Sequence, residues 1–442
     1  MPQASHMVRV TARLSPTRAR RESDDLGSRL SADLGLAAGD WIGWGHQACF
    51  WHCGVLAKGM AAEAMARKHA AGVVHLLADQ DEGDVASVVY PALVDGRWER
   101  HCHHFLNAAA GRVAAAQPAA RPRSSPEGLT EDVSASLGRI HHALGDSMAA
   151  PSAAAQVNRA AFELAAPWLR PPERIVAASE LFRSTTARRL LEQMCREPLP
   201  CASAFNRALE LDRGVARPLM IAADPRRIEL PVWLVNSAGA RLRVNADQCR
   251  RALDENQLLV PRAFLATGLV RMATNAFVHG TGGERYERVG DQFWLKWLGV
   301  SIPPPSMVSA DVPLSSEPLP NAPADPRTLQ FDPWRAEGSG EVSLQLRQLR
   351  AAIEEAPRGS DQRHDAYESM RARVAFERQR NAPHIERAEA AWRQWQERCA
   401  STRILAARDW PFPLHRSESL ERLFAEVQAG VAADAADSGS GR

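Results

Sequence analysis

The sequence predicts an α/β protein with a parallel-sheet core and a C-terminal helical arm. Between Leu36 and Leu106 an alanine-rich helix precedes a short apolar strand that ends in carboxylates, the order of a βαβ unit in a parallel sheet. From Val342 to Arg403 the chain is rich in Arg, Glu, Gln and Ala, with apolar residues mostly three or four positions apart. That spacing is typical of a helical hairpin or a coiled coil.

Length and composition narrow the class of protein. The 442 residues exceed one ordinary domain, so we expect two domains or one large domain with an appendage. A hydrophobic content of 45%, a charged content of 24% and a net charge of +2 indicate a globular protein with neither a nucleic-acid nor a membrane partner. Seven cysteines without an apolar export signal indicate reduced thiols. We therefore expect a cytoplasmic protein.

The first expected elements lie in the N-terminal half of the core. A glycine- and aromatic-rich loop is expected from Asp40 to Trp51, followed by a helix from Gly54 to His69. Val73 to Leu77 is a short β-branched and apolar run, as in a strand buried on both faces. Val85 to Leu93 predicts a further strand.

The later elements are predicted from apolar periodicity. Helices are expected from Thr130 to Trp168, from Pro172 to Arg196, from Pro200 to Leu211 and from Glu287 to Leu298, and a strand from Leu230 to Val235. Nine prolines between Ile302 and Pro333 argue against regular structure there.

These expectations divide the chain into six segments. They are an N-terminal extension (1–34), a core (35–301), a proline-rich linker (302–337), a helical coiled-coil arm (338–408), a return segment to the core (409–431) and a disordered tail (432–442). Charged helical arms of this type usually serve dimerisation, so we expect a homodimer formed through the arm.

A glycine-rich turn, with three glycines in the four positions from Gly280 to Gly283, lies between an apolar segment and an amphipathic helix. The free amides of such a turn, here including Thr281 and Gly282, suit a phosphate or a carboxylate. The alternative is a tight structural turn, because glycine is also placed where backbone conformation demands it.

A second group surrounds the start of the helix at Gly54. His46 and His52 precede this helix and Lys58 lies one turn inside it, so a phosphate there would meet amides, imidazole and ammonium together. The alternative is a pair of packed histidines, since histidine is intermediate in burial.

A third group is acidic. Asp79, Asp81 and Asp84 follow the strand that ends at Leu77, at the sheet edge where ligands of parallel sheets bind. One of them would hold Mg²⁺ or an amino group, or act as a base. A solvated loop is the alternative.

A fourth group would suit zinc. Cys49, His52 and Cys53 are followed by His101, Cys102, His103 and His104, which supplies enough soft ligands for the metal. The spacing fits no common zinc ribbon, so zinc stays an alternative to a phosphate-binding loop.

The order of these motifs resembles that of the bacillithiol-biosynthesis cysteine-adding enzymes. The resemblance is carried by these segments: Gly45-His46-Gln47, Lys58, the Asp79-x-Asp81-x-x-Asp84 cluster, Glu229 to Trp233, Arg271, Phe277 to Tyr286, and Pro303-Pro304. The chain departs from the family in three places. His46 replaces a glutamine, Gly282-Gly283-Glu284 replaces Pro-Gly-Glu, and Tyr286 is one residue closer to Glu284. The chain is also shorter than a typical member.

The resemblance implies a Rossmann-type core related to the nucleotidyltransferases, followed by a coiled-coil arm used in dimerisation. It also implies a ligase that joins an amino acid, cysteine or another, to an amine such as that of an amino sugar. Activation of the carboxylate by ATP with Mg²⁺ is the natural chemistry, because an amine attacks a carboxylate only after the carboxylate gains a leaving group.

Roles follow from the motifs and the resemblance together. The expected catalytic residues are His46, His52, Lys58, Asp81 and Glu284. The expected nucleotide-binding residues are Gly45, Gln47, Gly54, Gly280, Thr281, Gly282 and Gly283. The expected substrate-binding residues are Asp79, Asp84, Trp233, Arg271, His279 and Tyr286. Two other classes stay open, a zinc-binding hydrolase and a non-catalytic dimeric scaffold.

Overall fold

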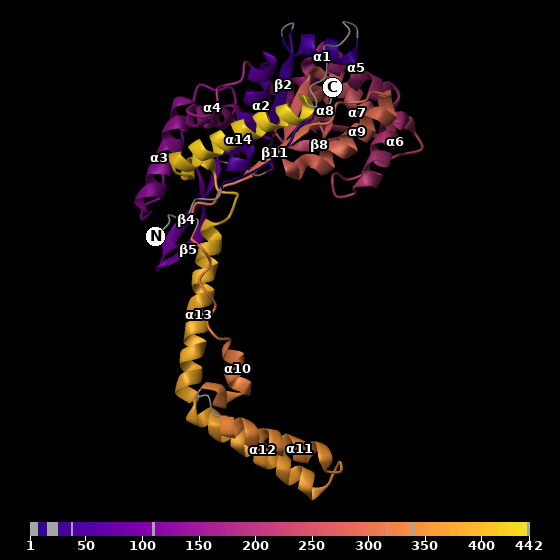
Figure 1. Ribbon diagram of the computed structural model, residues 1–442. Coiled ribbons are helices and arrows are strands. Elements are labelled where there is room, and N and C mark those ends of the chain that lie inside the picture. Colours follow the sequence, from indigo (N-terminus) through magenta and orange to yellow (C-terminus); the bar gives the residue numbers. More distant parts are fainter. Residues whose placement is uncertain are drawn as a thin grey trace. The chain divides into compact units, whose positions relative to one another are not determined.

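The computed structural model describes residues 8–15, 25–36, 39–107, 111–315, 317–336 and 340–439. The chain divides into two compact units (Figure 1). Unit 1 comprises residues 1–92, 100–316 and 406–442, and unit 2 comprises residues 93–99 and 317–405. No helix in the described ranges is long and apolar enough to cross a membrane.

Unit 1 contains a six-stranded sheet in the order β1-β11-β10-β2-β3-β6. The strands are β1 (Arg9–Arg13), β2 (Trp41–Gln47), β3 (Gly72–Ala78), β6 (Arg174–Ala177), β10 (Ala276–His279) and β11 (Ser306–Asp311). All neighbouring pairs are parallel except β1 with β11. The predicted α/β class with a parallel sheet is therefore confirmed.

Helices cover both faces of this sheet. Their bounds are α1 (Leu26–Asp33), α2 (Cys53–His69), α3 (Glu131–Asp146), α4 (Ala153–Ala165), α5 (Thr185–Arg196), α6 (Pro198–Ala208), α7 (Ala246–Asp254), α8 (Leu265–Ala273), α9 (Glu284–Leu298) and α14 (Ser417–Gly439). Along β3, Val73 and Leu77 pack into one cluster with α2, α3, α4 and α14, whereas Val74 and Leu76 pack with α1 and α5 to α9. This alternation is the period of two expected of a strand buried on both sides.

The chain order places a switch point in the sheet. From β2 the chain passes through α2 to β3 and later to β6, on one side of β2, and it returns to β10 and β11 on the other side. The strand order therefore reverses between β2 and β10.

The other strands form two smaller sheets. Strands β7 (Glu229–Val235), β8 (Arg241–Asn245) and β9 (Leu258–Pro261) form an antiparallel sheet in the order β8-β7-β9. Strands β4 (Ser87–Val94) and β5 (Arg97–His104) form a two-stranded sheet.

Helix α2 lies at the centre of unit 1. Fourteen of its 17 residues are buried, because it packs against β2, β11 and α14. Small side chains permit this, since a Cβ at Gly59 would lie 2.7 Å from Leu169 and 3.0 Å from Trp44. A helix buried all round, rather than an amphipathic one, is what its alanine, glycine and methionine content specifies.

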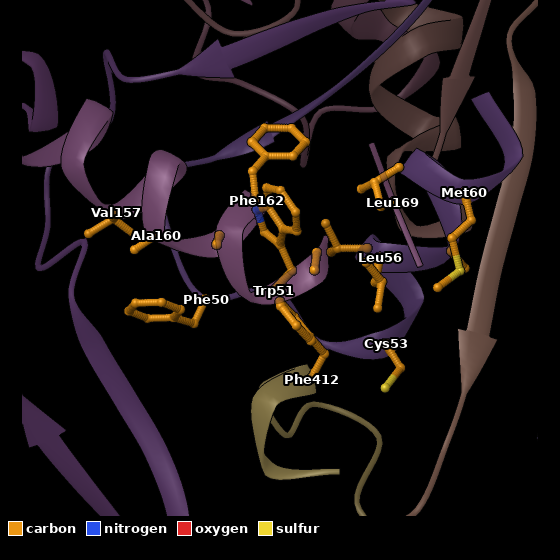
Figure 2. Close-up of a cluster of buried hydrophobic side chains, with 14 of the residues drawn as sticks. Phe50, Trp51, Cys53, Leu56, Met60, Val157, Ala160, Phe162, Leu169 and Phe412 are labelled. Carbon is orange, nitrogen blue, oxygen red and sulfur yellow. The ribbon is translucent and has the colours of Figure 1, made fainter. Parts of the chain in front are cut away.

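An aromatic cluster anchors the segment that returns to unit 1. In Figure 2 the Trp51 ring lies between Phe162 and Phe412, with ring centroids 5.0 and 6.3 Å away. The backbone N–H of Phe412 also donates to the carbonyl of Trp51 (2.7 Å). Residues from both ends of the sequence therefore share one core.

Unit 2 is helical apart from the tips of β4 and β5. It contains α10 (Pro326–Phe331), α11 (Gly340–Glu355), α12 (Asp361–Arg380) and α13 (Ala382–Leu405). Helices α11 and α12 pack side by side (Figure 1) over a small core of Trp334, Val342 and Leu346.

The secondary-structure predictions are confirmed where the apolar pattern is strong and wrong in several other places. The helix at Gly54–His69 and the strand at Val73–Leu77 form as predicted. The expected loop from Asp40 to Trp51 is instead mostly strand β2. Its glycines are needed because a Cβ at Gly43 would lie 2.6 Å from the Phe277 ring. The region from Pro172 to Arg196 begins with strand β6 rather than a helix.

Segments expected outside the core also join it. Strand β11 lies within the proline-rich stretch, and β1, from the expected N-terminal extension, pairs with it. The strand expected from Val85 to Leu93 overlaps β4, but that strand is not part of the main sheet. Helix α14 extends to Gly439, into the expected disordered tail, of which residues 440–442 lie outside the described residues.

Lowering the pH is expected to destabilise unit 1 through His75. Its Nε2 donates to Asn158 Oδ1 (3.1 Å) in the core, and burial lowers the pKa of His75 from 6.5 to about 3. Between these values the unfolded chain binds a proton that the folded chain does not. The free energy of unfolding therefore falls as the pH drops through this window.

We expect His75→Gln, which keeps an N–H donor for Asn158, to flatten this pH dependence in urea unfolding followed by tryptophan fluorescence. The exposed His142→Gln variant is the control. Equal slopes for the two variants would contradict the prediction.

Candidate functional site

A cavity of about 530 Å³ lies in unit 1 at the carboxyl ends of three neighbouring parallel strands. Gln47 ends β2, His279 ends β10, and Gln80 follows β3. This is where the strand order reverses, the place at which open parallel sheets bind ligands. The lining residues are Gln47, Gln80, Asp81, Glu82, Val215, Ala216, Arg217, Trp233, Arg241, Arg262, Ala263, Phe264, Thr267, His279, Tyr286 and Glu287.

One wall of the cavity is an ion-pair network on β8 and the loop after β3. Arg241 contacts Asp81 Oδ1 (3.2 Å) through Nη1 and Glu82 Oε1 (3.4 Å) through Nε. Gln47 Nε2 donates to the other Asp81 oxygen at 2.5 Å. Asp81 is thus held by two side chains at once, and this fixes its position at the end of β2.

A second wall is built on Trp233 of β7. The guanidinium carbon of Arg262 lies 4.7 Å from the centroid of the Trp233 ring, and that of Arg241 lies 5.4 Å from it. Arg262 is buried and pairs with Glu229 (3.0 Å), and its Nη2 donates to the carbonyl of Arg217 (2.8 Å). Burial lowers the pKa of Arg262, although its pairing with Glu229 opposes that shift.

The third wall joins β10 to α9 through His279 and Glu287. His279 Nε2 lies 3.4 Å from Glu287 Oε1, and Nδ1 lies 3.1 Å from the carbonyl oxygen of Gly280. Burial lowers the pKa of His279, with Glu287 acting in the opposite direction. The ring fits only because residue 283 is glycine, since a Cβ there would lie 1.8 Å from His279 Cε1.

Arg271 lies behind this wall and does not line the cavity. Its Nη1 pairs with Glu287 and with Asp291 (2.7 Å), and its Nη2 donates to the carbonyl of Pro303 at 2.5 Å. The Arg271 and Glu287 side chains are 1% and 3% exposed. Arg271, expected to bind substrate, therefore holds Glu287 in place instead.

Lys58 is also behind the cavity. Its Nζ donates to the carbonyl of Gly45 (2.8 Å), and its Cδ lies 3.6 Å from where a Cβ of Gly280 would be. Burial lowers the pKa of Lys58 to about 8, partly offset by Cys49 and Glu287. The ammonium therefore stays mostly protonated at pH 7 and contributes positive charge beneath the third wall.

The expected phosphate-binding group at the start of α2 is occupied by internal contacts. The N–H of Gly54 donates to Nδ1 of His52 (3.1 Å). The backbone of His52 pairs with that of Pro411 in an isolated antiparallel β-bridge. His46 faces the carbonyl of Gln47 (3.2 Å) and the thiol of Cys49 (3.5 Å). Burial lowers the pKa of both histidines. His46 and His52 are therefore both engaged in contacts within the chain.

The acidic residues diverge rather than converge. Asp79 is buried and accepts from the N–H (2.8 Å) and Oγ (2.6 Å) of Ser179. Asp84 accepts from the N–H of Ala86 (3.0 Å) and pairs with His104. Asp81 alone of the three lines the cavity. The cluster therefore does not form a shared magnesium site.

The residues proposed for zinc are not gathered either. Within the described ranges no group of three or more His, Cys, Asp or Glu side chains is placed to hold a metal ion. Burial raises the pKa of Cys49 to about 12 and raises that of Cys53 as well. His101 and Cys102 lie on β5.

The glycine-rich turn forms the short 3₁₀ helix η5 (Thr281–Gly283), in which the N–H of Gly283 donates to the carbonyl of Gly280 (2.8 Å). Glu284, expected to be catalytic, is partly exposed and pairs with Arg13 (2.7 Å) outside the cavity lining. Tyr286 lines the cavity and is 44% exposed. The main contact of this turn is with the His279 ring, which Gly283 and Gly280 position.

Of the expected site residues, the structure brings Gln47, Asp81, Trp233, His279 and Tyr286 to one cavity. The sequence prediction missed the polar lining residues Gln80, Glu82, Arg217, Arg241, Arg262, Thr267 and Glu287. Position gives a signal for three of them, because Gln80 and Glu82 flank Asp81 and Glu287 lies one helical turn after Gly283. The arginines come from distant segments without a motif.

Replacing Arg271 with methionine is expected to lower the free energy of unfolding by about 3 to 5 kcal/mol, because buried carboxylates would lose their partner. Urea unfolding measures the change. The matched control is Arg13→Met, which removes the exposed pair with Glu284 and should leave the unfolding midpoint unchanged. Similar midpoints for the two variants would show that Arg271 has no structural role.

Two comparisons with known proteins find no relative of this chain. A scan against models of protein families finds no match. A search of curated proteins finds none either.

Proposed function

We propose that the cavity binds an amino acid and that unit 1 joins its carboxyl group to the amine of a second small molecule, such as an amino sugar. The observation that carries this proposal is the buried Gln80 side chain in the cavity wall. It is 7% exposed, and its Oε1 has no hydrogen-bond partner in the described part of the chain. A buried carbonyl oxygen without a donor costs free energy that a bound N–H group, such as an ammonium, recovers.

The charges of the lining support a zwitterionic ligand. Asp81, Glu82 and Glu287 are balanced by Arg217, Arg241 and Arg262. Arg241 and Arg262 are paired with carboxylates, whereas no ion pair of the exposed Arg217 side chain is found in the described ranges. We assign the ligand's carboxylate to Arg217 and its ammonium to Gln80. A cavity within the range of about 300 to 1,000 Å³ typical of small-molecule sites has room for an amino acid and a small acceptor.

The reaction type rests on the resemblance to the cysteine-adding enzymes. The parallel sheet with its switch point supports the Rossmann-type core that the resemblance implies, and the coiled-coil arm and the homodimer rest on the resemblance alone. Seven free cysteines support a cytoplasmic, reducing compartment. Because His46, His52 and Lys58 are engaged in contacts within the chain, we assign no step to ATP.

Amino-acid binding is tested by isothermal titration calorimetry with a panel of amino acids that includes cysteine. We expect Gln80→Leu and Arg217→Met each to weaken binding about tenfold or more, because a hydrogen bond to a charged group contributes about 1.5 to 3 kcal/mol. The control is Arg213→Met, an exposed arginine of the same loop that does not line the cavity. Equal loss in the control, or no binding by the wild type, contradicts the assignment.

Amide formation is tested separately by mass spectrometry. The chain is incubated with the best-bound amino acid and a panel of amines that includes glucosamine derivatives, with and without ATP and Mg²⁺. We expect a product whose mass is the sum of the two substrates less one water. Amino-acid binding without product in any combination would leave a binding protein and overturn the ligase proposal.

A further inference from the structure

We propose that His279 is the general base that takes a proton from the acceptor's ammonium, with Glu287 and the Gly280 carbonyl placed to hold the resulting imidazolium. This inference rests on the proposed function. It is argued from the surroundings of the ring, which lies in the cavity wall where β10 ends.

The hydrogen-bond geometry favours one tautomer of the resting ring. Nδ1 lies 3.1 Å from the carbonyl oxygen of Gly280, whereas Glu287 Oε1 is 3.4 Å from Nε2 and forms no hydrogen bond with it, so we assign the proton to Nδ1. In the neutral ring Nε2 is then an acceptor with a free lone pair. The nearest carboxylate oxygen, Glu287 Oε1, is 3.4 Å away and has no hydrogen-bond partner among the described side chains and backbone.

Protonation of Nε2 changes this contact from two facing acceptors to an ion pair. The imidazolium then has the Gly280 carbonyl as the acceptor of its Nδ1–H and the Glu287 carboxylate, with Oε1 3.4 Å from Nε2, as a counter-charge. A carboxylate held beside the place where positive charge appears is the kind of electrostatic preorganisation that favours proton transfer. Glu287 itself cannot swing away, because Arg271 holds its other oxygen.

The charged groups around the ring set its resting state. Glu287 on α9 favours the charged ring, while Lys58 on α2 and Arg271 on α8 oppose it, and burial opposes it most. The net effect lowers the pKa of His279, so the ring is neutral and able to accept a proton at pH 7. Lys58 is fixed by its bond to the Gly45 carbonyl and remains as a counter-charge to Glu287.

The proton transfer is balanced as follows. One N–H bond of the acceptor's ammonium breaks and its proton moves to Nε2 of His279, which leaves a neutral amine with a lone pair. The proton is later released from Nε2 to solvent, and the ring returns to its neutral tautomer.

The titration of His279 is measured by NMR on the full chain with ¹³C-labelled histidine, the signal being assigned with His279→Gln. We expect Glu287→Gln to shift the pKa of His279 further down, because it removes a neighbouring negative charge that raises this pKa. An unchanged titration would overturn the inference. This measurement needs no substrate, so its result is independent of the proposed function.

A second pair of variants keeps the test valid if Glu287→Gln does not fold. Gly283→Ala places a methyl group against the His279 ring, whereas a Cβ at Gly282 meets nothing within 4 Å. We expect Gly283→Ala to move the titration of His279 and Gly282→Ala to leave it unchanged. The same shift in both alanine variants would contradict the role assigned to the ring's position.

The catalytic part is tested by ligation kinetics. His279→Gln is expected to lower kcat by roughly 10²- to 10⁴-fold, the usual loss for a general base, with amino-acid affinity unchanged within about twofold. The rate of the wild type should rise with pH through the pKa of His279, and that dependence should vanish in the variant. A variant that ligates at the wild-type rate overturns the inference while leaving the ligase proposal intact.

Discussion

The cavity depends on one buried guanidinium. Arg271 of α8 binds Glu287 and Asp291 of α9 and the carbonyl of Pro303, which precedes β11. It thereby joins α8 and α9 to the segment that leads into β11. It also fixes the side of α9 that carries Glu287. Such a cluster is stable only when every buried charge has its partner, which makes it sensitive to the loss of any one member. The position of Glu287 in the third wall follows from it.

Much of the fold could be predicted from periodicity, but not the elements whose composition reflects their neighbours. The helix at Gly54–His69 and the strand at Val73–Leu77 carry clear patterns. Strand β2 does not, since its glycines exist to admit the rings and side chains of β10 and β3 rather than to make a loop. Strand β11 is hidden in the same way by flanking prolines, which lie outside its ladder.

The site shows the same limit. Residues at the carboxyl ends of strands were predictable because the βαβ order places those ends together, and so Gln47, Asp81 and His279 share the cavity. Lys58, Asp79 and Arg271 have the chemistry of ligand-binding groups but are used inside the protein, in bonds to Gly45, Ser179 and Glu287. Residue type alone does not distinguish a ligand-binding side chain from one that is bonded inside the protein. Burial does distinguish them, and the alanine-rich sequence around Lys58 is a hint that this lysine is buried.

The aromatic contact between Trp51 and Phe412 has a consequence for how the chain is made. Trp51 is synthesised early, whereas Phe412 and the helix that covers α2 are translated only after the whole of unit 2. At about 5 to 20 residues per second, the apolar surface of α2 stays uncovered for tens of seconds on the ribosome. The C-terminal segment can therefore dock on α2 only after unit 2 has been synthesised.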